Sequence, residues 1–121
     1  MRVNSVFKVT PLKDPKLQRY KSNAIKELNA FFNRRWVYHT PRIFVVDDRK
    51  TINLLKEEKT KDWVVGWAWG GSIIFILNPK NISKESSHTN YTYNIAKLIK
   101  HELCHSFFFI IFWNEQFYMD Q

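Results

Sequence analysis

Residues 63–77 read Trp63-Val-Val-Gly-Trp-Ala-Trp-Gly-Gly-Ser-Ile-Ile-Phe-Ile-Leu77 and predict a β-hairpin. Two runs rich in β-branched and aromatic residues, 63–69 and 72–77, are separated only by two glycines, 70–71. A two-residue turn between antiparallel strands needs positive φ angles, which glycine adopts without steric cost. Asn78-Pro79 should end the second strand, because proline cannot donate to a sheet ladder. We therefore expect two adjacent antiparallel strands in the second half of the chain.

Helices and a further strand are predicted on both sides of this hairpin. Asp14-Pro15 has the pattern of an N-cap followed by proline at the first helical position, and apolar residues then recur at helical spacing. The other segments are the remainder of that helix to about Phe32, a buried strand over 42–47, a short helix over 49–57, a polar loop over 80–90 and a long helix from about Tyr91. The sequence therefore predicts one α+β domain over residues 1–121, with a small twisted sheet, mostly antiparallel or mixed.

Composition excludes several other classes of protein. The chain has 121 residues, of which 45% are apolar, so it can bury a core. Its one cysteine, Cys104, excludes an intrachain disulfide framework. The longest apolar run, 107–113, is far shorter than the roughly 20 residues of a membrane helix. The first residues contain no apolar stretch typical of a signal peptide, so we expect a cytoplasmic protein without a membrane partner.

The positive charge is concentrated in the first half of the chain. The formal net charge is +8, and residues 1–61 hold 15 Lys and Arg against 6 Asp and Glu. Such a basic half could contact nucleic acid, although a solvated lysine-rich helix surface explains it more simply. No motif typical of nucleic-acid binding is present, so charge alone supports no such partner. The sequence gives no indication of oligomeric state.

The long C-terminal helix carries His101-Glu102-Leu-Cys-His105, which matches the HExxH pattern. Residues four apart lie one turn apart on one helix face, so both imidazoles can reach a single ion. Zinc held by two His and one further ligand keeps an open position for water. Glu102 can accept a proton from that zinc-bound water as it attacks a carbonyl. The alternative is a His–Glu cluster on the surface of an ordinary helix.

A third ligand has few candidates, because no His follows His105 and the only later acids are Glu115 and Asp120. Glu115 lies in Trp113-Asn114-Glu115. With HExxH and this Asn-Glu pair, the sequence resembles the gluzincin group of zincin metallopeptidases, in which a metal-binding Glu follows HExxH on a second helix. In size and layout it is most similar to the single-domain minigluzincins.

This resemblance implies a minimal zincin-like fold with a backing helix, an active-site helix and a short C-terminal glutamate helix. It implies a Zn²⁺ cofactor bound by His101, His105 and Glu115, with Glu102 as general base of a zinc-dependent metalloendopeptidase. A turn near residues 107–113 is then required, because an unbroken helix would place Glu115 about 15 Å farther along its axis than His105. Minigluzincins are described as latent, so a latent state is also open for this chain.

The resemblance further implies that a peptide or unfolded protein binds as an extended strand along a sheet edge. Either hairpin strand could supply that edge, and the residues expected there are Trp67, Trp69, Ile73 and Phe75. Two accessory residues precede the active-site helix. His88 could line the cleft or replace the third ligand, and Tyr91 could donate a hydrogen bond to the oxyanion. Solvation of His88 and helix-start packing of Tyr91 are the simpler interpretations.

Two other functions remain open at this stage. A SprT-like protease of DNA–protein crosslinks would suit the basic first half and the Leu-Cys within the motif. That family uses a third His downstream, and this chain has none there. A catalytically inactive zincin-fold binding protein would suit the short spacing between His105 and Glu115.

Overall fold

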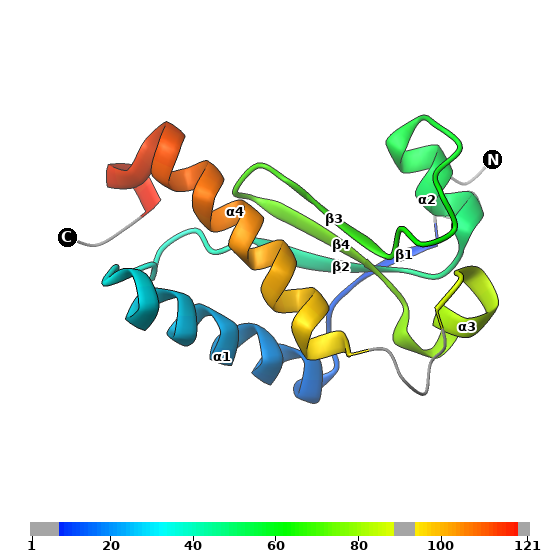
Figure 1. The fold of residues 1–121 in the computed structure, drawn as a ribbon, viewed down its shortest axis with the longest axis horizontal. Coiled ribbons are helices and arrows are strands. Elements are labelled where there is room, and N and C mark those ends of the chain that lie inside the picture. The colour runs from blue at the N-terminus through cyan, green and yellow to red at the C-terminus, as the bar shows by residue number, and fades with distance from the viewer. Residues whose placement is uncertain (1–7, 89–93, 119–121) are drawn as a thin grey trace.

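The computed structural model describes residues 8–88 and 94–118, and for 113–118 it describes the backbone but not the side chains. The described part is an α+β fold with a mixed four-stranded sheet, which confirms the predicted fold class (Figure 1). Its elements in chain order are β1 (Val9–Pro11), α1 (Pro15–Phe32), β2 (Arg42–Val46), α2 (Arg49–Lys56), β3 (Gly66–Trp69), β4 (Ile73–Leu77), the 3₁₀ helix η2 (Pro79–Asn81), α3 (Ile82–Glu85) and α4 (Ile95–Tyr118).

The sheet has the strand order β1-β2-β4-β3. β4 runs parallel to β2, with Phe44 opposite Phe75, whereas β3 runs antiparallel to β4. The predicted hairpin is confirmed, and Gly70 in its turn has a φ of 57°, in the left-handed region that favours glycine. β3 pairs only with β4 among the described strands, so it forms one edge of the sheet.

The helices begin where the local side chains cap them. Asp14 accepts a hydrogen bond from the backbone N–H of Lys16 at 2.9 Å, which confirms the predicted start of α1. Residues 80–90, expected to be loop, instead contain η2 and α3. Asn78 explains the difference, because its side chain accepts from the N–H of Lys80 and caps a short helix that proline opens.

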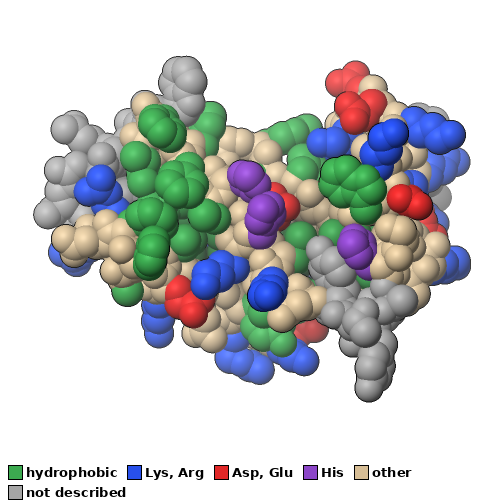
Figure 2. Space-filling view, viewed as in Figure 1, with side chains coloured by type: hydrophobic (Ala, Val, Ile, Leu, Met, Phe, Trp, Pro, Cys, Tyr) green, Lys and Arg blue, Asp and Glu red, His purple; other side chains and the backbone are tan. Residues whose placement is uncertain are grey.

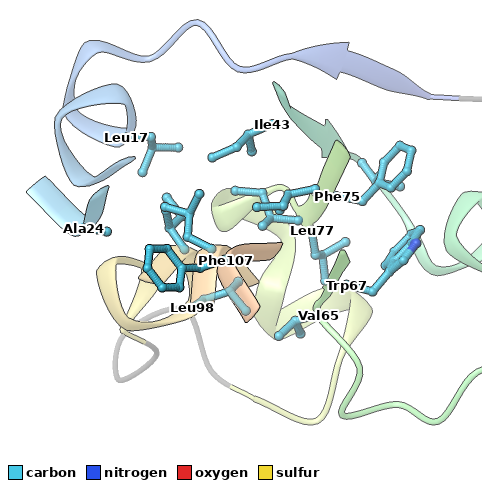
Figure 3. Packing of buried hydrophobic residues seen from close by; sticks show 14 of the residues in the cluster. Leu17, Ala24, Ile43, Val65, Trp67, Phe75, Leu77, Leu98 and Phe107 are labelled. Atoms are coloured by element: carbon cyan, nitrogen blue, oxygen red, sulfur yellow. The ribbon is translucent and has the colours of Figure 1, made fainter. Parts of the chain in front are cut away.

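The core lies between the sheet and the two long helices, α1 and α4. Ile43, Ile74 and Ile76 project from the sheet toward α4 and are almost fully buried. Figure 3 shows Leu17 and Ala24 of α1 gathered near Phe107 of α4 on this helical side. The ring of Phe107 stacks on that of Phe32 with centroids 5.1 Å apart. Each such buried side chain contributes roughly 1.5–3 kcal/mol, so this layer fixes α4 against the sheet.

α4 is one continuous helix from Ile95 to Tyr118. The predicted turn near 107–113 and the separate glutamate helix are therefore wrong. Phe107 and Ile110 are fully buried and extend the apolar stripe begun by Leu103, so breaking the helix there would expose core residues. Gly71 in the hairpin turn lies so close to Ile110 that an added Cβ would stand 2.5 Å from its Cγ1. Within the described ranges, no helix is both long enough and apolar enough to cross a membrane.

Candidate metal centre

The HExxH histidines converge on one point at the surface of α4. His101 and His105 are both exposed, and their Nε2 atoms lie 3.1 Å apart. Their rings are nearly perpendicular, at 89°, with centroids 4.6 Å apart. Two nitrogens this far apart, each at the Zn–N distance of about 2.0–2.1 Å, would subtend roughly 95–100° at a shared ion. This angle is near tetrahedral, so the pair fits two ligand positions of one zinc ion.

Glu102 lies between this pair and the sheet. It is 5% exposed, and its Oε2 would stand 3.5 Å from a Cβ added at Gly66 of β3. Burial raises the pKa of the Glu102 carboxyl, while positive charge on His101, His105 and Lys56 acts in the opposite direction. A carboxyl with a raised pKa beside two imidazoles is a suitable general base.

The sheet edge above Glu102 belongs to β3. The N–H of Leu77 donates to the carbonyl of Val65 at 2.8 Å, which fixes the alternation of the antiparallel ladder. The N–H and C=O groups of Gly66 and Ala68 therefore point away from β4, toward the open edge. These groups can pair with an extended peptide.

Two of the four residues expected at the edge lie elsewhere. Ile73 and Phe75 belong to β4, which is paired on both sides and cannot offer its backbone to a peptide. Trp67 and Trp69 do belong to the edge strand. Their side chains project from the face opposite Gly66, and the Trp67 ring stacks on Phe75 with centroids 4.8 Å apart.

Two cavities meet at Glu102. The first, of about 440 Å³, lies along β3 and α4 and is lined by Gly66, Trp67, Ala68, Gly70, His101, Glu102, His105 and Phe109. The second, of about 570 Å³, shares Gly66, Trp67, His101 and Glu102 with the first and continues toward the segment after α2. Figure 2 shows two adjacent histidine side chains near the centre of this face, beside a large hydrophobic area. Together the cavities form one cleft beside the edge strand.

The remaining predicted site residues are His88, Tyr91 and Glu115. His88 lines the second cavity, and its Nε2 lies 3.2 Å from the carbonyl oxygen of Trp63. Tyr91 lies outside the described residues. Glu115 lies on the continuous α4, about 15 Å along the axis from His105, and its side chain is not described. Over the described ranges, no group of three His, Cys, Asp or Glu side chains is arranged to hold a metal ion.

The sequence did not identify two residues of the cleft, Gly66 and Lys56. Gly66 permits close approach of β3 to α4, and an isolated glycine inside a strand pattern is a recognised sign of such an approach. Lys56 arrives from α2, with its Nζ 5.2 Å from the centroid of the Trp67 ring. No spacing rule connects Lys56 with a motif 45 residues later in the chain.

Comparison with protein-family models, with curated proteins and with solved structures gives no match for this chain. The zincin-like interpretation therefore depends on the HExxH geometry and its place beneath an antiparallel edge strand.

Proposed function

We propose that this chain is a zinc-dependent peptide hydrolase of the zincin type. In this proposal His101 and His105 bind the metal and Glu102 acts as general base. The observation that carries it is the 3.1 Å separation of the two Nε2 atoms, next to a buried carboxyl under a sheet edge. A solvated surface cluster gives no reason for the carboxyl to be buried.

The chain's own residues supply binding and proton transfer. The backbone groups of Gly66 and Ala68 pair with an extended peptide and align it along β3. Zinc, when bound, supplies a Lewis acid that polarises a carbonyl and lowers the pKa of water toward neutrality. Glu102 takes a proton from the attacking water and returns it to the leaving nitrogen. The Glu102 carboxyl is nearly excluded from solvent, which strengthens its interaction with that proton.

The third ligand is the incomplete part of this site, because among the described side chains only the two histidines are brought together. Glu115 could join the two histidines only if α4 broke between them. Losing the burial of Phe107 and Ile110 would cost roughly 3–6 kcal/mol. A third ligand would have to raise zinc affinity by roughly two to four orders of magnitude to offset that cost.

A second candidate function is favoured by the continuity of α4. If Glu115 does not bind the same metal ion as the histidines, the chain is a protein of zincin-like fold that binds extended peptide at the β3 edge without cutting it. The edge backbone and the cleft serve such a protein equally well.

Hydrolysis of an unfolded protein separates the two candidates. We expect the zinc-loaded protein to cut reduced, unfolded casein, and Glu102→Gln to lower the rate by about 10²–10⁴-fold while the variant retains zinc. Undiminished cutting by Glu102→Gln would remove the proposed base. Bound zinc and bound peptide without cutting by the wild type would select the second candidate.

A further inference from the structure

One end of the cleft is basic. The second cavity extends from His101 and Glu102 to a rim that includes Lys56, Lys59 and Lys61. No described residue forms an ion pair with these three lysines, whereas Lys8 and Lys100 pair with carboxylates elsewhere on the molecule. Apart from Glu102, the described lining contains a single acid, Glu58. With three lysines against Glu58 and Glu102, the lining of this cavity keeps a net positive charge.

The basic rim is held in place by hydrogen bonds. The Arg49 guanidinium donates to the Thr60 hydroxyl at 2.9 Å and to the carbonyl of Asp62 at 3.1 Å. The N–H of Thr60 donates to the Asn53 side chain at 2.8 Å. The residues on either side of Lys61 are thus tied to α2. Charges presented from a fixed segment lose less entropy when they bind a ligand.

The other end of the cleft is apolar. Phe109 lines the first cavity and is 42% exposed, and Phe108 and Phe112 on the same helix are also exposed. Figure 2 shows hydrophobic side chains gathered over the C-terminal half of α4, next to two adjacent histidine side chains. An added Cβ at Gly70 would stand 3.1 Å from the Phe109 ring, so the hairpin turn supports that ring.

From these two ends we infer that the cleft selects extended peptides that are acidic on one side of the histidine pair and apolar on the other. The inference deepens the proposed function and rests on the same site. A strand rises about 3.3 Å per residue, so a few residues on each side of the reacting bond reach both ends. Acidic side chains complement Lys59 and Lys61, and apolar side chains bury against Phe109.

Peptide binding tests this inference without depending on turnover. Zinc-loaded Glu102→Gln is titrated into four fluorescein-labelled decapeptides, and fluorescence anisotropy gives each dissociation constant. Two peptides join a Glu/Asp half to a Leu/Phe half, in opposite orders. The third replaces the acids by lysine, and the fourth replaces the apolar half by Gly/Ser. We expect one acidic–apolar order to bind about tenfold tighter than the lysine peptide, since two exposed charge pairs together contribute this much.

Matched variants identify the residues responsible. Lys59→Glu combined with Lys61→Glu should abolish or reverse the preference for the acidic peptide. Lys16→Glu combined with Lys26→Glu makes the same change of net charge on exposed positions of α1 and should leave the preference intact. Phe109→Ser should remove the advantage of the apolar half.

The outcomes separate the inference from the proposed function. Absent peptide binding, equal binding of all four peptides, or tighter binding of single-stranded DNA than of any peptide would overturn the inference. Hydrolysis by the wild type without any acidic–apolar preference would also overturn it while leaving the proposed function standing. A preference that depends on Lys59 and Lys61 without hydrolysis by the wild type would support the inference and count against catalysis.

Discussion

Gly66 brings the backbone of the edge strand β3 against Glu102 of α4. A Cβ added to Gly66 would lie 3.5 Å from the Glu102 Oε2 atom, 3.1 Å from Leu98 Cδ1 and 3.2 Å from the carbonyl oxygen of Phe75. The last contact is with backbone, which cannot move aside without distorting β4. This glycine therefore sets the distance between the proposed general base and the strand that would hold the peptide.

We predict that Gly66→Val destabilises the protein by about 1–3 kcal/mol, because it overpacks the boundary between β3 and α4. It should also weaken peptide binding at the edge, because the strand must shift away from Glu102. Urea unfolding measures the first effect and peptide anisotropy the second. Unchanged stability and unchanged binding together would show that the close approach at Gly66 has no role.

Phe107 should be among the most costly positions on α4 to truncate. It is fully buried, and its ring contacts Phe32 and Trp36, with the second pair of centroids 5.5 Å apart. We expect Phe107→Ala to lower the free energy of unfolding by about 3–5 kcal/mol. Phe112→Ala is the matched control, because that ring is 81% exposed and its loss should change stability by less than about 0.5 kcal/mol. Equal effects of the two substitutions in urea unfolding would place the core elsewhere.

A break in α4 should reveal whether Glu115 can bind zinc. Ile111→Pro removes a helical hydrogen bond and clashes with the preceding turn, which costs a helix about 3 kcal/mol. We expect Ile111→Pro to bind zinc at least tenfold more tightly than Ile111→Ala, because the chain can then fold back. Adding Glu115→Gln to Ile111→Pro should return the zinc affinity to that of Ile111→Ala. If both proline variants bind zinc as Ile111→Ala does, Glu115 is not the third ligand.

Acid should weaken the capping of α2 by Asp48. Its carboxylate accepts a hydrogen bond from the N–H of Thr51 at 2.9 Å. Burial alone would raise the pKa of Asp48, but the hydrogen bonds from Thr51 and the charges of Lys8 and Lys50 outweigh it, so this pKa is lowered. The folded pKa lies below the unfolded one, so the stabilisation is present above about pH 4 and is lost as pH falls through the folded pKa.

Asp48→Asn keeps a capping side chain and removes this titration. We therefore expect wild type to be more stable than Asp48→Asn at pH 7, by about 1 kcal/mol or less, and the difference to shrink at pH 3. Urea unfolding at the two pH values measures both quantities. A stability difference that is the same at pH 7 and pH 3 would contradict a lowered pKa for Asp48.

The sequence predicted those parts of the fold that local chemistry determines. The Gly-Gly pair at 70–71 predicted the hairpin, and Asp14-Pro15 predicted the start of α1; the structure confirms both. Strand order is different, because it depends on which surfaces pack together. The sequence therefore did not predict which hairpin strand, β3 or β4, forms the edge of the sheet. In the structure β4 pairs with β2 as well as with β3, so β3 is the edge strand.

The error over α4 has a specific cause. The resemblance required a turn before Glu115, but the stretch from Ser106 to Trp113 contains no Gly or Pro to make one. Phe107 and Ile110 instead continue the buried stripe of the helix, and that packing is a tertiary effect. The place of Lys56 in the cleft was not predicted for a related reason: only the folded chain brings the end of α2 to the cleft.

Zinc binding tests the central claim most directly. Purified protein is stripped of metal and titrated with zinc against a chromophoric chelator, alongside His101→Ala, His105→Ala and Glu102→Gln. We expect one zinc per chain for the wild type and Glu102→Gln, and at least a hundredfold weaker binding for each histidine variant. Failure of the wild type to bind zinc, or binding that survives the loss of either histidine, would contradict a metal centre built on this pair.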